Sequence, residues 1–532
     1  MNKNDLAVRR GFLANAMGFG AAAATVGLTS TNTAQAQTAG DLGQVTNFAA
    51  LRSYTGSATT LHVLGRSIAG DAGGGVFRKE TGSIPFADND GTVITPSGVS
   101  GSSVAWLRVY SGPMDVRWFG AEPHPSNFQH VAIQKALDAA TWIPGGASPE
   151  NYPDRGGSEV YIPPGTFRIN APLLIKIGVS LIGDGLGSHI RAIGFDAIRF
   201  EFNTSFGNSV VRGLQLTAGA PAREVAQVGI NVPGSTNVDH QLHGITIENC
   251  LIRDFGVGIH FRSVKNFSII NNWIQNVEVG IELKGRNLVG FVAFNKVAYG
   301  DGNIFGENAT PRTPTALLLD SDDFTQGNPE ELGRIPNEGI QILSNSFYGF
   351  HDGINVVHSR FVNINMNDVH ATVNGVLFKY VELSLNIKDN YIEASGAAAM
   401  NGIKGAGAGF PMETQVNIEG NSVFGNNVQA CTGIEINDAT ARFQDHVRIV
   451  RNVIQRMAKY DILINRPGPC TIENNRCMSI NVTKSIKVGV VEQKPVFVFR
   501  NFCQKTIELN SADLAAGAVK AGDNIVNGSN WL

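Results

Sequence analysis

Two short segments of the chain bring together side chains that can move protons. The segment GIHFR, with His260 and Arg262, and the segment GIELK, with Glu282 and Lys284, share one pattern and begin 22 residues apart. If the two segments pair in register, His260 lies beside Glu282 and Arg262 lies beside Lys284. An imidazole next to a carboxyl group is an arrangement suited to general acid–base chemistry.

Acidic residues continue at a similar phase after these two segments. A pair of carboxyl groups can divide the work of acid–base catalysis, one protonating a leaving group and the other activating water. The candidate catalytic residues are therefore the acids on neighbouring segments: Glu282, Asp320, Asp322 and Asp352. The polar residues around them are the candidate substrate-binding residues: His260, Arg262, Lys284, Asp323, His351 and Asn355.

The basic residues leave a second chemistry open. Arg262 and Lys284 are suited to hold an anionic substituent of a substrate, or to act as a base and as the neutraliser of a substrate carboxylate. His260, His351 and His358 are candidate proton carriers. Because any outward sheet face shows Glu, Lys and Asp to solvent, each of these residues also has a purely structural interpretation.

A repeating element has to position these side chains, and the middle of the chain contains one. Between roughly residues 240 and 480, short alternating segments each end in asparagine, at spacings of 23, 23, 50, 22, 23, 31, 31 and 23. Short strands at a repeat near 23 are typical of a parallel β-helix, whereas an antiparallel sandwich does not explain one residue type at one phase. Because an asparagine amide can bond the asparagine of the next coil, we expect an internal ladder: Asn249, Asn272, Asn295, Asn345, Asn367, Asn390, Asn421, Asn452 and Asn475.

Both ends of this repeat have segments suited to cover it. Residues 127–142 have the pattern of an amphipathic helix, with Ser126 or Asn127 as the N-cap, and such a helix would cover the open apolar end of a β-helix. Residues 506–532 lose the repeat, and we expect them to cap the last coil.

The five cysteines indicate neither a disulfide framework nor a metal site. None forms a Cys-x-x-Cys pair, and no metal-binding His cluster stands out, so no metal site is expected. Cys477 and Cys503 each follow an asparagine by two residues. We therefore expect them to stack on neighbouring coils as two buried thiols, with a disulfide as the alternative.

The N-terminus has the pattern of an export signal. Arg9 and Arg10 are followed by Gly-Phe-Leu, an apolar Ala/Gly-rich stretch spans residues 14–28, and Ala34-Gln-Ala supplies small residues for cleavage. Residues 1–36 are therefore expected to be a twin-arginine signal peptide, which predicts a periplasmic or secreted protein. The formal charge of -3, without a basic stretch, argues against a nucleic-acid partner. No other window approaches 18 consecutive apolar residues, which argues against a membrane partner.

Three motifs resemble the start of the pectate lyase-like superfamily: Trp118-Phe-Gly-Ala121, Val160-Tyr-Ile-Pro-Pro-Gly165-Thr-Phe and Leu181-Ile-Gly-Asp-Gly185. That superfamily includes polygalacturonase-related hydrolases, pectate lyases and phage tailspike depolymerases. The resemblance implies a right-handed parallel β-helix, over residues 116–505, with an elongated groove on the outside of one sheet. The fold class expected is all-β, a single-stranded solenoid with an N-terminal capping helix and a small N-terminal β module.

Residues 37–115 resemble a second unit, the small β-rich module that often precedes such helices in tailspike-like proteins. The residues that carry this resemblance are the runs GDAGGGVF from Gly70, DNDGTVI from Asp88 and WLRVY from Trp106. Tailspike-like relatives are commonly trimers, so the analogy predicts a homotrimer.

The resemblance leaves the reaction open. The paired Asp322-Asp323 of the polygalacturonase pattern is present, but the Gly-His-Gly and Arg-Ile-Lys of that pattern are absent. The calcium-site spacing of pectate lyases is not evident either. The segment from Asn271 to Glu282 resembles a coil of the β-helical inulin fructotransferases, where such a Glu is catalytic. Our first hypothesis is an exported carbohydrate-active enzyme that cleaves glycosidic bonds of a polysaccharide with acid–base carboxylates and needs no cofactor. The alternatives are a lyase acting by β-elimination on a uronate-containing glycan, with Ca²⁺ as its candidate cofactor, and a non-catalytic glycan-binding or adhesive β-helix.

Overall fold

A computed structural model describes most of the chain. The described residues are 43–531, except for 83, 85–86, 100–102, 125, 142–157, 177, 202–207, 220–226, 235–241, 301–312, 322–335, 397, 407–413, 428–429, 438–445, 466–468 and 490–494. The expected signal peptide, residues 1–36, lies outside the described residues. In the part of the chain that is described, no helix is long and apolar enough to cross a membrane.

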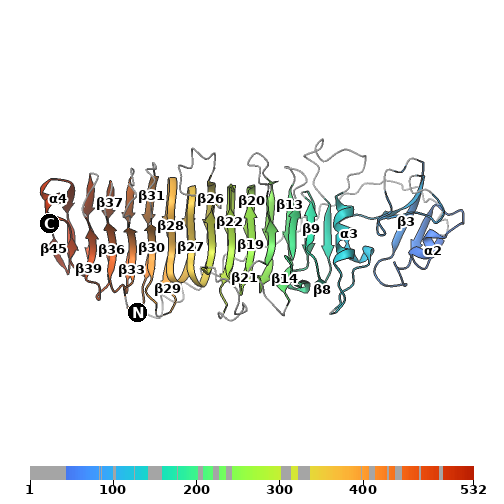
Figure 1. Cartoon of the computed structure of the whole chain (residues 1–532), viewed down its shortest axis with the longest axis horizontal. Coiled ribbons are helices and arrows are strands. Elements are labelled where there is room, and N and C mark those ends of the chain that lie inside the picture. The colour runs from blue at the N-terminus through green and yellow to red at the C-terminus, as the bar shows by residue number, and fades with distance from the viewer. Residues whose placement is uncertain are drawn as a thin grey trace, which may run out of the picture. The chain divides into compact units, whose positions relative to one another are not determined.

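The first described unit is a small five-stranded sheet with the strand order β1-β2-β3-β5-β4 (Figure 1). β1 pairs with β2 in parallel, and the other pairs are antiparallel. A short helix, α2, packs Phe48 and Leu51 against Phe77 and Trp106 of the sheet. The elements are β1 (Gly43–Val45), α2 (Phe48–Arg52), β2 (Thr60–Val63), β3 (Gly75–Thr81), β4 (Val93–Ile94) and β5 (Val104–Val109).

The helix α3 (His130–Ala140) confirms the amphipathic pattern, since its buried side chains belong to the same core as the first coils. Gln134 bonds both the N–H and the carbonyl of Leu174 in the first coil. The expected N-cap is wrong: the residue before the helix is Gln129, and its side chain makes no cap hydrogen bond. The helix begins late because His124 Nδ1 already accepts hydrogen bonds from the N–H groups of residues 126 and 127, which hold that segment in a turn.

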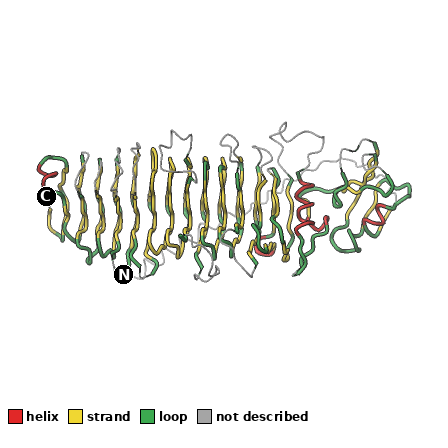
Figure 2. Tube along the Cα trace, in the orientation of Figure 1, coloured by secondary structure: helices red, strands yellow, loops and turns green. Residues whose placement is uncertain are grey.

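After α3 the strands stack as successive coils of a parallel β-helix (Figure 2), as the repeat predicted. Each coil passes through three sheets in turn, which we call sheets I, II and III. Sheet I contains β6 (Met114–Asp115), β7 (Glu159–Ile162), β10 (Ser180–Gly183), β13 (Ser209–Arg212), β16 (Leu242–His243), β17 (Ile245–Glu248), β20 (Val264–Ile270), β23 (Leu288–Ala293), β26 (Asn337–Leu343), β31 (Thr414–Glu419), β34 (Val447–Val450), β37 (Cys470–Glu473), β40 (Val496–Phe499) and β43 (Val519–Gly522). Sheet II contains β8 (Gly165–Ile169), β11 (Ser188–Ala192), β14 (Gln215–Ala218), β18 (Leu251–Arg253), β21 (Trp273–Gln275), β24 (Lys296–Ala298), β29 (Tyr391–Ala394), β32 (Ser422–Phe424), β35 (Val453–Gln455), β38 (Arg476–Cys477), β41 (Phe502–Cys503) and β44 (Asn524–Val526). Sheet III contains β9 (Leu173–Lys176), β12 (Ile198–Glu201), β15 (Val228–Val232), β19 (Val257–Arg262), β22 (Val279–Lys284), β25 (Thr315–Asp320), β30 (Asn401–Ala406), β33 (Thr432–Asn437), β36 (Tyr460–Asn465), β39 (Lys484–Val488) and β42 (Ile507–Glu508).

Two strands in the middle of the chain run through all three sheets without a break. β27 (Ser346–Asn365) and β28 (Asp368–Lys388) pair with each other along their whole length. Coil pairing continues past residue 505, because β43 and β44 still pair in parallel with the coil before them. The chain then reverses in β45 (Ser529–Trp531), which is antiparallel to β44. The remaining short helices are η2 (Val116–Phe119), η4 (Gly185–Gly187) and α4 (Ser511–Ala515).

The asparagine ladder is present between sheets I and II, displaced by one residue at its start. Each ladder oxygen accepts from both the backbone and the side-chain nitrogen of the preceding asparagine, as Asn295 does from Asn272 at 3.0 Å each. Asn249 is not a member: it has φ 54, and Cys250 stands at the ladder position and donates its N–H to Asn272. The turn between sheets I and II contains two residues: the first has a left-handed backbone conformation, and the side chain of the second points inward. Asn249 occupies the first of these positions, so its assignment to the ladder was wrong. The ladder runs through Asn272, Asn295, Asn345, Asn367, Asn390, Asn421, Asn452, Asn475, Asn501 and Asn524.

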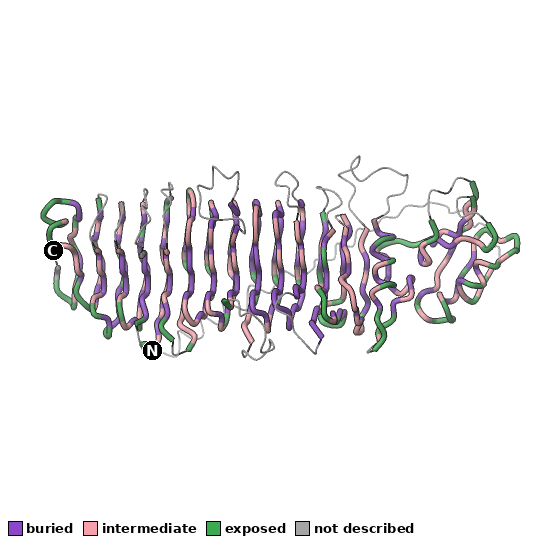
Figure 3. Tube along the Cα trace, viewed as in Figure 1, coloured by how far each residue is buried: buried purple, intermediate pink, exposed green. Residues whose placement is uncertain are grey.

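Buried residues recur in every coil and form one continuous core (Figure 3). Cys477 and Cys503 stack in register within it, both as free thiols, which confirms the expectation of buried thiols. A hydrogen bond to Cys503, together with burial, raises the pKa of the Cys477 thiol well above its ordinary value. Such a thiol stays protonated and behaves as a small apolar group.

Candidate functional site

The candidate site begins with two neighbouring strands of sheet III, β19 and β22. They pair in parallel with His260 opposite Glu282 and Arg262 opposite Lys284, which confirms the register inferred from the sequence. Strand alternation turns Ile281 into the core and leaves Glu282 on the outer side. The carboxyl group is nevertheless almost covered, with 3% of the residue exposed.

His260 and Lys284 both contact the Glu282 carboxyl group. His260 Nδ1 lies 2.9 Å from Oε2, and Lys284 Nζ lies 3.4 Å from Oε1. A buried carboxylate without such partners would be costly, so these contacts favour its ionised form. A small apolar cluster lies beside it on sheet III, where Val257 and Val279 pack with the partly buried Leu318, the residue in register with Glu282. Glu282 is thus a covered carboxyl group in contact with the imidazole of His260 and the ammonium group of Lys284.

Asp320 lies one coil further on, at the end of β25. The register pairs Lys284 with Asp320 and Glu282 with Leu318. Coils are about 4.8 Å apart and residues about 3.3 Å apart along a strand, so one coil and two residues separate the Cα atoms of Glu282 and Asp320 by about 8 Å. Strand alternation places Asp320 on the same outer side of sheet III as Glu282.

Asp352 lies in a different contact network from Glu282. Asp352 is in register with Thr315 of the preceding coil, so it lies two coils beyond Glu282 and nearer the start of the strand. Its Oδ1 is 2.9 Å from His351 Nδ1 and accepts from Asn374 at 2.7 Å, while Oδ2 accepts from Asn355 at 3.2 Å. Asp352, His351 and Asn355 are therefore together, as expected, but with three donors of their own around the carboxylate. The other two acids of the sequence hypothesis, Asp322 and Asp323, lie outside the described residues.

A second polar cluster, on the outside of sheet II, was missed by the sequence analysis. Tyr348 and His370 stack with ring centroids 4.9 Å apart, and both bond Asp368, at 2.8 and 2.9 Å. One coil on, Tyr391 donates to Glu393 at 2.7 Å, and burial together with this bond raises the pKa of Tyr391 to about 12. The signal was available, because Tyr348 and His370 are 22 residues apart, the period of the ladder.

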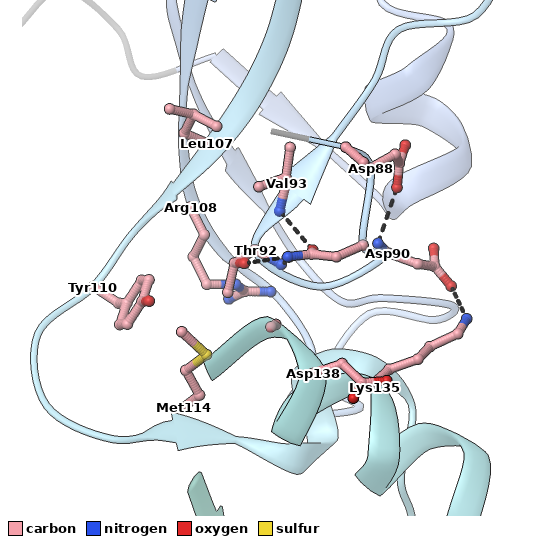
Figure 4. Close-up of a pocket in the computed structure, with 13 residues that line it drawn as sticks. Asp88, Asp90, Thr92, Val93, Leu107, Arg108, Tyr110, Met114, Lys135 and Asp138 are labelled. Atoms are coloured by element: carbon pink, nitrogen blue, oxygen red, sulfur yellow. Dashed lines mark hydrogen bonds and ion pairs between the residues drawn. The ribbon is translucent and has the colours of Figure 1, made fainter. Parts of the chain in front are cut away.

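A cavity of about 570 Å³ lies between the N-terminal sheet and α3 (Figure 4). Its wall includes Leu107, Met114 and the ion pair of Lys135 with Asp90, in which nitrogen and oxygen are 3.3 Å apart. Arg108 also lines it, but its guanidinium donates to the carbonyls of residues 73 and 74 at 2.6 Å each, and burial lowers its pKa to about 10. These hydrogen bonds give Arg108 a structural role in the N-terminal sheet. Every described candidate site residue from the sequence analysis lies on the solenoid, outside this cavity.

The described residues contain no group of three His, Cys, Asp or Glu side chains that could hold a metal ion.

The N-terminal sheet and the start of the solenoid each match a different protein family. Residues 114–198 match the family described as rhamnogalacturonase A/epimerase, pectate lyase-like, and residues 44–111 match the small four-stranded β-sheet domain of phage tail proteins. The stacked parallel coils make the chain a parallel β-helix protein, and the first match shows that residues 114–198 are similar to a pectate lyase-like domain, as the motifs implied. A comparison with curated proteins found no match.

Solved structures of the same fold extend over most of the chain at low identity. Tailspike protein 2 from Escherichia coli O157:H7 bacteriophage CAB120 is 16% identical, with a TM-score of 0.50, over 78% of this chain and 51% of the tailspike. The catalytic unit of the GH87 α-1,3-glucanase of Streptomyces thermodiastaticus is 13% identical, with a TM-score of 0.51, over 81% of this chain and 72% of the glucanase. The chain thus spans about half the length of the tailspike, and the likeness is one of fold.

Proposed function

We propose that this protein is a carbohydrate-active enzyme that hydrolyses glycosidic bonds of a polysaccharide along sheet III. The observation that carries the proposal is Glu282, a carboxyl group covered to 3% exposure and held between His260 and Lys284. A buried, doubly contacted carboxyl group on an outward strand position is unusual for a face that merely meets solvent. Asp320, about 8 Å away from backbone to backbone, supplies the second carboxyl group.

The contacts suggest a division of roles. Lys284 and His260 favour the ionised form of Glu282, which makes it the base that activates water, and His260 can take up the proton. Asp320 is then the acid that protonates the leaving oxygen. The pectate lyase-like match, the phage tailspike and the α-1,3-glucanase of similar fold all support polysaccharide as the substrate class.

A lyase is the second candidate, favoured by one observation. Arg262 and Lys284 lie in register on adjacent coils, so two cations stand side by side next to Glu282. Such a pair could neutralise a uronate carboxylate and supply the base for β-elimination. Hydrolysis yields a new reducing end alone, whereas elimination also yields an unsaturated uronate that absorbs in the ultraviolet.

The test is a screen of uronate-containing and neutral polysaccharides, followed by Glu282→Gln and Asp320→Asn on the substrate that is cleaved. We expect each variant to lose roughly 10²–10⁴-fold in kcat, the usual contribution of a general acid or base. Glu435→Gln is the matched control, because Glu435 is also largely buried, at 7% exposure, and lies further along the same column of sheet III. Full activity in both site variants, or equal losses in Glu435→Gln, would reject the assignment. The column passes in successive registers through Glu282, Leu318, Asn355, Leu377, Lys404 and Glu435.

Export is part of the proposal. The twin-arginine pattern at Arg9 and Arg10 directs the folded enzyme out of the cytoplasm, where a polysaccharide substrate would be met. Changing both residues to lysine should leave the protein in the cytoplasmic fraction, whereas unchanged export would reject this route.

A further inference from the structure

Three polar side chains from three successive coils form a hydrogen-bonded relay at the corner between sheets III and I. Ser321 follows β25, His358 lies in β27 and Glu382 lies in β28. Ser321 Oγ is 2.5 Å from His358 Nδ1, and His358 Nε2 is 3.1 Å from Glu382 Oε1. None of the three belongs to the proposed glycosidase pair.

The fold explains why these residues meet. Ser321 comes directly after Asp320, and the register of Leu319 with Val356 places His358 at the corresponding position one coil later, with φ 46. Earlier coils have Ser263 and Gly285 at this turn, also with positive φ, so the backbone shape there belongs to the solenoid. This corner differs from the earlier ones in its side chains, which are largely buried: Ser321 is 7% exposed, His358 0%, and the Glu382 side chain 16%.

The order of groups is that of an activated serine. A carboxylate that accepts from one imidazole nitrogen keeps the proton on that nitrogen, so the other nitrogen is left as an acceptor. Here Glu382 fixes the proton on Nε2, and Nδ1 faces the Ser321 hydroxyl as a base. The usual serine hydrolase uses the same three groups with the two nitrogens exchanged, and triads are recognised by geometry and roles rather than by sequence position.

We propose that Ser321 is the nucleophile of an ester-hydrolysing site, with His358 as its base and Glu382 as the positioning residue. The substrate class is a carboxylic ester of a sugar hydroxyl, such as an O-acetyl group; the choice of a sugar ester rests on the proposed function, while the nucleophile does not.

The reaction would run in two balanced halves. In the first, Ser321 Oγ bonds to the acyl carbon while its proton passes to His358 Nδ1, and the sugar oxygen leaves with that proton. In the second, water gives a proton to His358 and its oxygen bonds to the acyl carbon. The acyl–serine bond then breaks, the serine regains its proton, and the carboxylic acid is released.

The first experiment treats the full protein with a fluorophosphonate probe and measures hydrolysis of 4-nitrophenyl acetate. We expect one probe per chain, mapped to Ser321 by peptide mass spectrometry, and turnover above background. Ser321→Ala should abolish both signals. Ser263→Ala is the matched control, since Ser263 occupies the same turn two coils earlier at 6% exposure, and it should keep both. Absent labelling, or labelling that survives in Ser321→Ala, overturns the proposal.

Two further variants separate the roles. Glu382→Gln should slow the labelling rate at least tenfold, and Glu382→Asp should restore part of it at an unchanged Tm, whereas equal rates in all three proteins would remove Glu382 from the mechanism. Glu282→Gln should lose polysaccharide cleavage and keep labelling at Ser321. Failure of the ester site and failure of the glycosidase site are therefore read from different signals.

Discussion

Asp461 gives the sharpest test of the solenoid interior. It stands in β36, at the place where the preceding coil has Gly433, and its side chain has no exposed surface. Neither carboxyl oxygen has a hydrogen-bond partner of good geometry. Burial raises its pKa from 3.8 to about 7, although the hydroxyls of Ser479 and Ser485 act in the opposite direction. The side chain is therefore a carboxylic acid that the fold prefers neutral.

The direction of the pH effect follows from proton binding. Between pH 4 and pH 7 the folded state holds the Asp461 proton and the unfolded state releases it, so stability falls as pH rises through this window and is level above it. A shift of about 3 units corresponds to about 4 kcal/mol in total, at 1.36 kcal/mol per unit. Between pH 5 and pH 8 the loss is about 2 to 3 kcal/mol.

Asp461→Asn removes this dependence while keeping the volume of the side chain. At pH 5 the variant should melt close to the wild type, and at pH 8 it should melt about 2 to 3 °C higher, since about 1 kcal/mol corresponds to about 1 °C for a chain of this length. The assay is differential scanning calorimetry of both proteins at each pH. Asp523→Asn, at an exposed position, is the control and should follow the wild type. Parallel pH curves for wild type and Asp461→Asn would refute the reasoning.

Three other expectations follow from the fold. Asn390→Ala should lower the free energy of unfolding by about 3 kcal/mol, because it leaves buried donors and acceptors of the ladder without partners. The control is Asn386→Ala, in the half-exposed row of amides on the outer side, which should lower it by less than about 1 kcal/mol. Urea unfolding compares the two variants, and equal losses would contradict the ladder's importance. A thiol reductant should leave the Tm unchanged, because Cys477 and Cys503 are free, and a drop in Tm on reduction would show a disulfide instead. Light scattering of the purified protein should give a homotrimer mass, as tailspike-like analogy predicts, and a monomer mass would reject that analogy.

The strand repeat and the helix before it were predictable from the sequence, whereas the exact position of a residue within a turn or at a helix end was not. The 22-residue offset between GIHFR and GIELK fixed the pairing of His260 with Glu282, because equal patterns stack in equal register. The same reasoning misplaced Asn249, because asparagine suits both the left-handed and the inward position of one turn, and phase alone does not separate them. The helix N-cap failed for a local reason, the capture of two N–H groups by His124.

The site was harder to predict than the fold, because its contacts join residues of unlike type on different coils. The separation of Asp352 from Glu282 depends on which donors reach each carboxylate, which spacing does not reveal. Ser321 and Glu382 escaped attention for the same reason, since each meets His358 across a coil boundary, 37 and 24 residues away. A periodicity argument finds columns of like residues and passes over such mixed contacts.

The ladder also keeps the distance between neighbouring coils independent of the length of the loops that connect them. Asn272 and Asn295 are 23 residues apart and Asn295 and Asn345 are 50 apart, yet both pairs are joined by amide bonds of 3.0 Å. Extra residues between the coils leave the vertical spacing untouched, so the stack is a scaffold of fixed rungs into which new loops can be inserted. Evolution, or an engineer, could change what borders sheet III in this protein coil by coil and keep the distance between Glu282 and its neighbours constant.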